Sequence, residues 1–188
     1  MTHPRRNHLR LLAAAIAYGA TASGATVGAL SMCVGGGGRP AVALAALAAA
    51  AGVLSWRRFR LSERHRVGAE SEERVRRQLN KLRGEGWKVR HGLQWPRGGD
   101  IDHALTAPNG LLVAVETKTR RYTARHVERT LHAAQWLRSG RRAPAIAVLV
   151  LAGERGVWRI ENDVVVVSAD RLLDVLRSHG AAATRRAA

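Results

Sequence analysis

The sequence contains little cysteine and little acidic charge. Cys33 is the only cysteine, which excludes an intrachain disulfide framework and a cysteine-rich zinc site. The eight histidines are scattered without metal-ligand spacing. Asp and Glu number 14 against 31 Lys and Arg, which gives a formal net charge of +17. A charge of this size indicates an anionic partner, either nucleic acid or acidic lipid, and does not choose between them.

Several common motifs are also missing. The sequence has no internal repeat, no Ser-His-Asp motif and no Gly-rich phosphate loop of the Walker type. The glycines of residues 35–38 lie between two apolar runs, so they indicate a turn and not a nucleotide site. At 188 residues the chain can hold one ordinary domain and an appendage.

Two uncharged apolar runs occupy residues 11–34 and 41–56. The first is long enough to cross a hydrocarbon core of about 30 Å, which takes about 20 helical residues. The second would reach only about 24 Å as a helix, but it ends in Trp56, a residue suited to the membrane interface. Small residues permit close helix contact, and the Gly-Pro segment between the runs supplies a turn. The pattern predicts a transmembrane hairpin.

Two other interpretations of these runs remain open. A cleaved signal peptide fits the basic start, although the first run is longer than a usual signal core and a second run follows it. Two helices of a soluble core would be expected to have a polar face, and neither run has one.

Basic residues flank the two runs on their outer sides. They are Arg5, Arg6 and Arg10 before the first run and Arg57, Arg58, Arg60, Arg64 and Arg66 after the second, with Arg39 alone between the runs. This asymmetry predicts a multi-pass membrane protein with two spans and with both termini cytoplasmic. Residues 57–66 would either lie on anionic headgroups or form a solvated linker.

From residue 67 the pattern changes to short helices and strands. Apolar residues recur at helical spacing over residues 68–83, and a strand is predicted at 87–93. Residues 99–118 are predicted to form two short antiparallel strands joined by a Pro-Asn-Gly turn. A helix at 124–138, a buried strand at 144–151, a strand pair at 157–168 and a helix at 169–178 follow. The chain therefore divides into residues 1–66, an α/β domain at 67–179 and a flexible basic tail at 180–188.

The second and third strands of this domain carry charged side chains. Side chains alternate along a strand, so Glu116 and Lys118 share one face, and Asp100 and Asp102 share one face of the partner strand. Half-buried charges need partners or a metal. Two carboxylates beside a lysine are suited to Mg²⁺, which is held by few protein oxygens together with water and substrate phosphate. Glu72 falls on the inner face of the opening helix, whereas compensation of the helix dipole, the other explanation for an acid there, suits Glu70 and Glu73 better.

Three strings at these positions resemble the nuclease-related domain (NERD) family and, through it, the PD-(D/E)xK nuclease superfamily. They are Gly99-Asp100-Ile101-Asp102-His103, Pro108-Asn109-Gly110 and Val115-Glu116-Thr117-Lys118. Asp102 corresponds to the family's aspartate, and Glu116 and Lys118 to its ExK pair. Residues 68–72 resemble the opening helix motif, with Ser71 where glycine is more usual, and Glu72 is then the helix acid.

The resemblance implies a restriction-endonuclease-like core, a mixed central sheet flanked by helices in the order αβββαβ. It implies Mg²⁺ or Mn²⁺ held by Asp102 and Glu116, with Lys118 acting on the attacking water and the phosphate and Glu72 supporting the metal through water. Gln135 is a further site candidate, for which a surface or capping role is favoured. His103 faces away from Asp102, which favours a packing role.

Four arginines follow the third strand and could hold phosphates by bidentate hydrogen bonds, although a solvated helix face explains them nearly as well: Arg120, Arg121, Arg125 and Arg129. The leading hypothesis is a membrane-tethered, metal-dependent nuclease that hydrolyses phosphodiester bonds in DNA. The alternative is a non-catalytic nucleic-acid-binding or scaffold module of the same fold at the membrane. A third possibility is a small membrane protein whose basic domain binds lipid or a partner.

Overall fold

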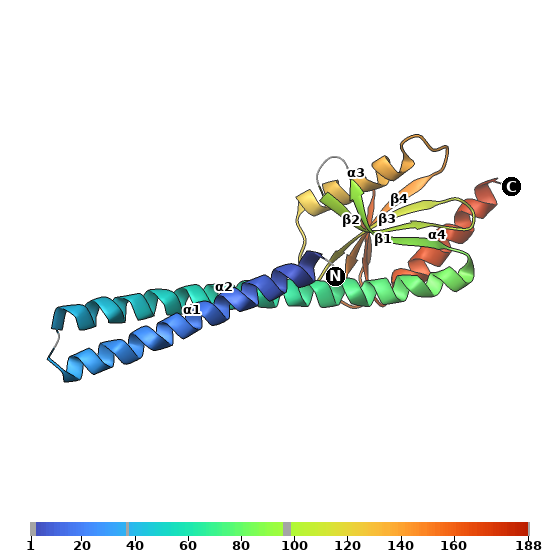
Figure 1. Cartoon of the computed structure of the whole chain (residues 1–188). Coiled ribbons are helices and arrows are strands. Elements are labelled where there is room, and N and C mark those ends of the chain that lie inside the picture. Colours follow the sequence, from blue (N-terminus) through green and yellow to red (C-terminus); the bar gives the residue numbers. More distant parts are fainter. Residues whose placement is uncertain (1–2, 37, 96–98, 188) are drawn as a thin grey trace. The chain divides into compact units, whose positions relative to one another are not determined.

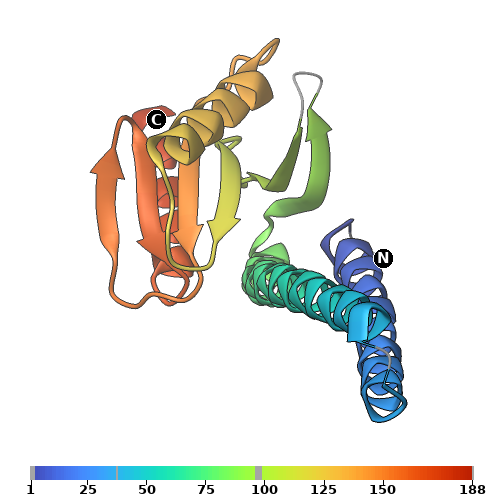
Figure 2. The ribbon, with the colours of Figure 1, turned by 90° about the vertical axis from the view of Figure 1, so that its left-hand side faces the viewer.

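The computed structural model describes residues 3–36, 38–95 and 99–187, with side chains described between residues 9 and 181 outside the two gaps. The side chains of Arg5 and Arg6, and Gly37 itself, therefore lie outside the described residues. The chain forms two compact units, residues 1–69 and 70–188, and the boundary falls within one continuous helix. Figures 1 and 2 show the elements of each unit.

The first unit consists of α1 (His3–Val34) and the first part of α2 (Gly38–Lys81), which run antiparallel to each other (Figure 1). Small residues allow the two helices to approach closely. Ser55 Oγ donates a hydrogen bond to the carbonyl oxygen of Ala15 at 2.7 Å, and a Cβ on Gly19 would lie 3.4 Å from Ser55 Oγ. Larger apolar side chains such as Val27 and Val42 point outward and are exposed.

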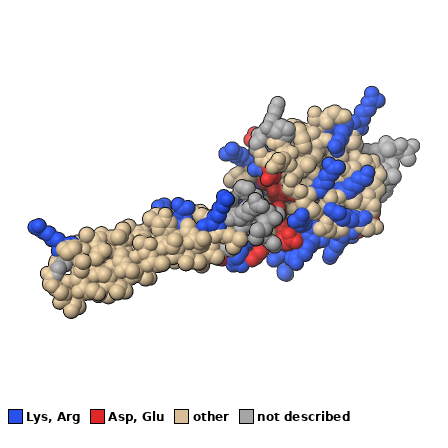
Figure 3. Space-filling view, viewed as in Figure 1, with Lys and Arg blue, Asp and Glu red and all other residues tan. Residues whose placement is uncertain are grey.

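Both helices are long and apolar enough, by length and composition, to cross a membrane: Leu9–Val34 and Gly38–Glu85. Figure 3 shows a long stretch of this helix pair whose visible face carries no charged side chain. Residues 57–66, for which contact with headgroups and a solvated linker were both open, form part of the continuous helix α2. The arginines there do not break a helix, since Arg is a good helix former and no Pro interrupts the segment.

The second unit is built on a six-stranded mixed sheet in the order β1-β2-β3-β4-β6-β5. β1 (Lys88–Trp95), β2 (Gly99–Thr106) and β3 (Leu112–Lys118) pair antiparallel. β3, β4 (Ala145–Leu151) and β6 (Val164–Ser168) pair parallel, and β5 (Trp158–Glu161) is the antiparallel edge strand. The predicted mixed α/β fold is confirmed at this level.

Helices cover both faces of the sheet. The end of α2, the short 3-10 helix η1 (Leu82–Glu85) and α4 (Leu172–Ala187) pack on one face, through Leu79, Leu82 and Leu176. α3 (Ala124–Arg138) packs on the other face, through Val127 and Leu137. The uninterrupted apolar run of β4 is explained by this arrangement, because β4 is buried from both sides.

Two element boundaries differ from the sequence-based predictions. α4 continues to Ala187, through residues that were expected to form a separate tail from Gly180 onward. Its alanine-rich end has high helix propensity, which explains the extension. β1 extends beyond residue 93 to Trp95, because it pairs with β2 as far as Gly99.

β2 belongs to two ladders of different length. It pairs with β1 over its whole length, from Thr106 to Gly99, whereas its pairing with β3 covers residues 103–106. The β1–β2 hairpin therefore diverges from β3 beyond His103, and a fork opens in the sheet at Asp102 (Figure 2).

Candidate active site at the fork between β2 and β3

The fork explains the position of Asp102. Leu112 N–H donates to the Pro144 carbonyl oxygen, and Lys118 O accepts from Ala152 N–H, so the even-numbered residues of β3 direct their backbone groups toward β4. The odd-numbered Thr117 then directs its N–H toward β2. Because β2 has diverged there, the Asp102 carboxylate takes this N–H, at 2.7 Å from Thr117 N to Asp102 Oδ2.

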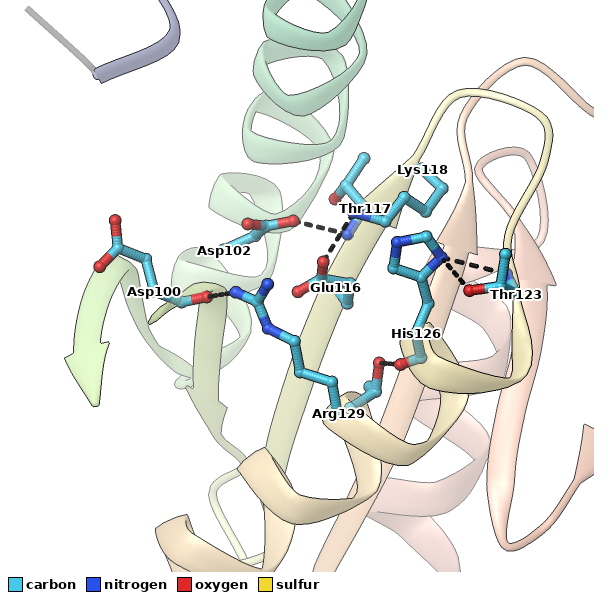
Figure 4. Close-up of polar contacts among 9 residues, drawn as sticks. Asp100, Asp102, Glu116, Thr117, Lys118, Thr123, His126 and Arg129 are labelled. Atoms are coloured by element: carbon cyan, nitrogen blue, oxygen red, sulfur yellow. Dashed lines mark hydrogen bonds and ion pairs between the residues drawn. The ribbon is translucent and has the colours of Figure 1, made fainter. Parts of the chain in front are cut away.

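Glu116 and Lys118 project from the same face of β3, as strand alternation predicts. Lys118 Nζ lies 2.8 Å from Glu116 Oε1 (Figure 4). The Glu116 side chain is 7% exposed and that of Lys118 is 26% exposed. The carboxylate is therefore almost removed from solvent, while the ammonium group remains accessible.

Two carboxyl groups of this site, Asp102 and Glu72, have a raised pKa. Burial, and then the charge of Glu116, raise the pKa of Asp102 to about 7, against the opposing effect of the Thr117 N–H. Burial also raises the pKa of Glu72 on α2; Arg76 opposes that rise, and the charges of Glu73 and Glu116 add to it. The structure therefore brings Glu72, Asp102 and Glu116 close enough for their charges to interact.

This set of oxygen donors suits a hard divalent cation. Two carboxylates that repel each other are stabilised by a shared cation, and Mg²⁺ commonly takes only one or two protein carboxylates. Within residues 9–36, 38–95 and 99–181, no group of three or more His, Cys, Asp or Glu side chains is arranged to hold a metal ion. Asp102 and Glu116 are a pair of oxygen donors that could hold such a cation, with water and substrate completing the coordination.

The predicted arginines divide into two groups. Arg129 is partly buried, and its Nη2 donates to the carbonyl oxygen of Asp100 at 2.8 Å, which places its guanidinium at the open side of the fork (Figure 4). Arg125 lies one turn earlier on α3 and is exposed. Arg120 and Arg121 are exposed in the loop between β3 and α3.

Gln135 is exposed on α3 and lines a groove with Trp95 and Trp136, and the small cavity beside Glu116 is lined by other residues of α3. His103 is fully buried, and its Nδ1 lies 2.9 Å from Nδ1 of His91 on β1. The packing role expected for His103 agrees with this position.

His126, in the first turn of α3, was missed from the sequence. Its Nδ1 accepts the backbone N–H of Thr123 at 3.0 Å, so in the neutral imidazole Nε2 carries the proton. Figure 4 shows the ring beside Lys118 and Glu116. Burial and the charge of Lys118 lower the pKa of His126. The available signal was Thr123-x-x-His126, a capping box with histidine in place of the usual Glu or Gln.

The family model of the nuclease-related domain (NERD) matches residues 67–148. The match includes the four residues predicted to be catalytic: Glu72, Asp102, Glu116 and Lys118. A nuclease-related domain is therefore found in this part of the chain. Comparisons with curated proteins and with solved structures found no match.

Proposed function

We propose that the protein is a metal-dependent nuclease of the PD-(D/E)xK type, which hydrolyses phosphodiester bonds in DNA. The observation that carries this proposal is the pair of mutually repelling carboxylates, Asp102 and Glu116, beside the accessible ammonium group of Lys118. Such a set is costly in a strand that serves packing alone, because buried charges destabilise a fold unless they are paired. The nuclease-related domain found around it supports the same class of reaction.

Each side chain has a distinct task in this mechanism. Asp102 and Glu116 would hold Mg²⁺ or Mn²⁺, which supplies Lewis acidity at the phosphate when bound. Lys118, held by Glu116 Oε1, positions the attacking water and stabilises the negative charge that develops on the phosphoryl oxygens. Glu72 supports the metal-binding pair from α2 through a water molecule.

His126 adds a hydrogen-bond donor that the sequence analysis did not include. Because Thr123 N–H occupies Nδ1, the protonated Nε2 is left to donate to a phosphate oxygen or to the leaving oxygen. Arg129 and Arg125 would hold neighbouring phosphates along the strand. Figure 3 shows Lys and Arg side chains over much of the visible face of the domain, a distribution suited to nucleic acid.

The proposal includes a location at the membrane. Two helices of sufficient length and apolar character support two membrane spans, and the excess of arginine outside the two spans supports cytoplasmic termini and a cytoplasmic nuclease domain. The lipid bilayer is then a second partner, besides nucleic acid.

A non-catalytic nucleic-acid-binding or scaffold module is the second candidate function. The short Lys118–Glu116 ion pair favours this second function, because the two groups neutralise each other's charge without a metal. In that case the site would bind phosphates through Lys118 and the arginines and would leave them intact.

A cleavage assay with the full-length protein in detergent tests the nuclease proposal. Single-stranded and duplex DNA and RNA are incubated in chelator, and then with Mg²⁺ or Mn²⁺ added in excess. We expect no cleavage in chelator and cleavage of DNA when either cation is restored. Binding of DNA without cleavage under all of these conditions would contradict the proposal and favour the binding module.

A further inference from the structure

A groove with aromatic and basic walls lies on α3, next to the proposed active site. It has a volume of about 570 Å³ and is lined by Trp95 at the end of β1 and by residues of α3. Among these are Trp136, His132, two arginines (Arg125 and Arg129) and one acid, Glu128. The two indole rings are nearly parallel, at an interplanar angle of 27°, with centroids 6.5 Å apart. This separation is near the upper end of the range for aromatic pairs, so the rings do not fully cover each other.

Both tryptophans are only partly buried. They pack against the core beneath α3 and also line the groove. Burial of a large aromatic ring stabilises a fold most when the ring is completely covered. Ring surface left open beside two arginines is instead suited to a flat ligand that carries negative charge, because such a ligand gains stacking and charge contacts together.

The groove and the proposed site share neighbouring residues. Trp95 and Arg129, which line the groove, also lie with Glu116 around a small gap that is too narrow to hold a water molecule. Along α3, Arg129 and Trp136 are separated by about 10 Å, at 1.5 Å per residue. This corresponds to about three stacked nucleotides at 3.4 Å each. A strand with one phosphate on Arg129 can therefore place a nearby base on Trp136.

We infer that this groove binds an unpaired nucleobase of the nucleic-acid strand, with the base on Trp136 and Trp95 and its phosphates on Arg125 and Arg129. The inference rests on the proposed function for the identity of the ligand. A base inside a duplex is covered on both faces by its neighbours, so it cannot stack on the indoles. The substrate therefore contains a single-stranded or unpaired segment next to the scissile bond.

Two oligonucleotides of equal charge isolate the contribution of the bases. One is oligothymidine of about 12 nucleotides, within the usual range of single-strand binding sites, and the other is an abasic strand of the same length. Their affinities for the full-length protein are measured by fluorescence anisotropy in detergent, with chelator present to prevent cleavage. We expect tighter binding of oligothymidine, by about tenfold or more, as for stacking of one or more bases.

Tryptophan variants test whether the preference for oligothymidine arises from the two indole rings. Trp136→Leu and Trp95→Leu keep an apolar side chain against the core and remove the ring, and Trp136→Phe restores a smaller one. The matched control is Trp158→Leu, at a 55% exposed residue on β5, at the opposite edge of the sheet. We expect the ratio of the two affinities to fall toward one in Trp136→Leu and Trp95→Leu, to recover in part in Trp136→Phe, and to stay unchanged in Trp158→Leu.

Equal affinity of the parent protein for the two strands would overturn the inference, as would a preference that survives removal of both rings. Failure to bind either strand would also overturn it, and would assign the groove to a partner of another class. Because binding is measured in chelator, its outcome is independent of cleavage. If the protein cleaves no nucleic acid but prefers the strand with bases, the nuclease proposal is refuted and the base-binding groove is supported. If the protein cleaves nucleic acid but shows no such preference, the nuclease proposal is supported and the base-binding groove is refuted.

Discussion

The carboxylate of Asp102 accepts the backbone N–H of Thr117 at 2.7 Å, where a backbone carbonyl of β2 would otherwise be expected. The bond satisfies a buried donor of β3 and at the same time holds the acid beside Glu116. One oxygen of this carboxylate therefore has a structural role, as acceptor of the Thr117 N–H, and the other is left for the proposed metal ion. Variants that separate charge from hydrogen bonding can distinguish these roles.

Asp102→Asn keeps an oxygen that can accept the Thr117 N–H and removes the charge. We expect the melting temperature in chelator to be unchanged or higher, because the repulsion from Glu116 is relieved, and metal-dependent cleavage to fall at least about 10²-fold. Asp102→Ala also removes the acceptor and leaves a buried N–H unpaired, so it should be less stable than Asp102→Asn by about 1–3 kcal/mol. Equal stability of the two variants would show that the fork does not depend on this bond.

Lowering the pH should destabilise the folded domain, because His103 is buried in its neutral form. Burial, with the positive charges of His91 on β1 and Arg76 on α2, lowers the pKa of His103 to about 3, below its value of about 6.5 in an unfolded chain. Between these values the unfolded state binds a proton that the folded state excludes, so stability is lost as pH falls below about 6.5. Burial, and then the charges of Arg76 and Arg83, lower the pKa of His91 as well, against the opposing effect of Glu73.

The measurement is the melting temperature between pH 7 and about 4, in the parent and in His103→Leu. Carboxylates titrate in both proteins, so the difference between the two curves reports the histidine. We expect the parent to lose more stability on acidification than the variant does. Parallel curves would contradict the neutral, buried state of His103.

Phosphate binding by α3 should appear in the salt dependence of DNA binding. Replacing Arg125 and Arg129 by Gln should reduce the slope of log affinity against log salt by about 0.7–0.9 for each phosphate that an arginine no longer neutralises. Arg171→Gln is the matched control, because Arg171 is exposed on the other side of the sheet, just before α4. An equal change of slope in control and test variants would assign the effect to net charge alone.

Much of the site could be predicted from the sequence, because strand alternation is a local property. It correctly placed Glu116 and Lys118 on one face of β3, and helical periodicity correctly gave α3 its bounds. The fork at Asp102 could not be predicted, since the length of a β ladder depends on tertiary packing. The pairing of Trp95 with Trp136 was missed for the same reason, and His126 because histidine is unusual in a capping box.

The topology of the N-terminal helices is directly testable. A reporter fused to either terminus should behave as cytoplasmic, whereas one inserted between residues 35 and 38 should be outside, because arginines concentrate beyond the outer ends of the two apolar runs. An extracellular or periplasmic C-terminus would contradict this topology. Fusions to a variant with Arg57 and Arg58 replaced by Gln test whether charge sets the orientation.

The central claim concerns Glu116 and Lys118, and it is tested most directly by measuring cleavage rate and melting temperature on the same two variants, Glu116→Gln and Lys118→Met. If the pair serves catalysis, each variant should remain folded, with cleavage at least about 10²-fold slower than in the parent, the usual effect of removing one group that stabilises the transition state. If the pair is a structural ion pair, either change leaves a partly buried charge unpaired and destabilises the domain. Loss of stability in both variants, with no metal-dependent cleavage in the parent, would contradict the nuclease assignment.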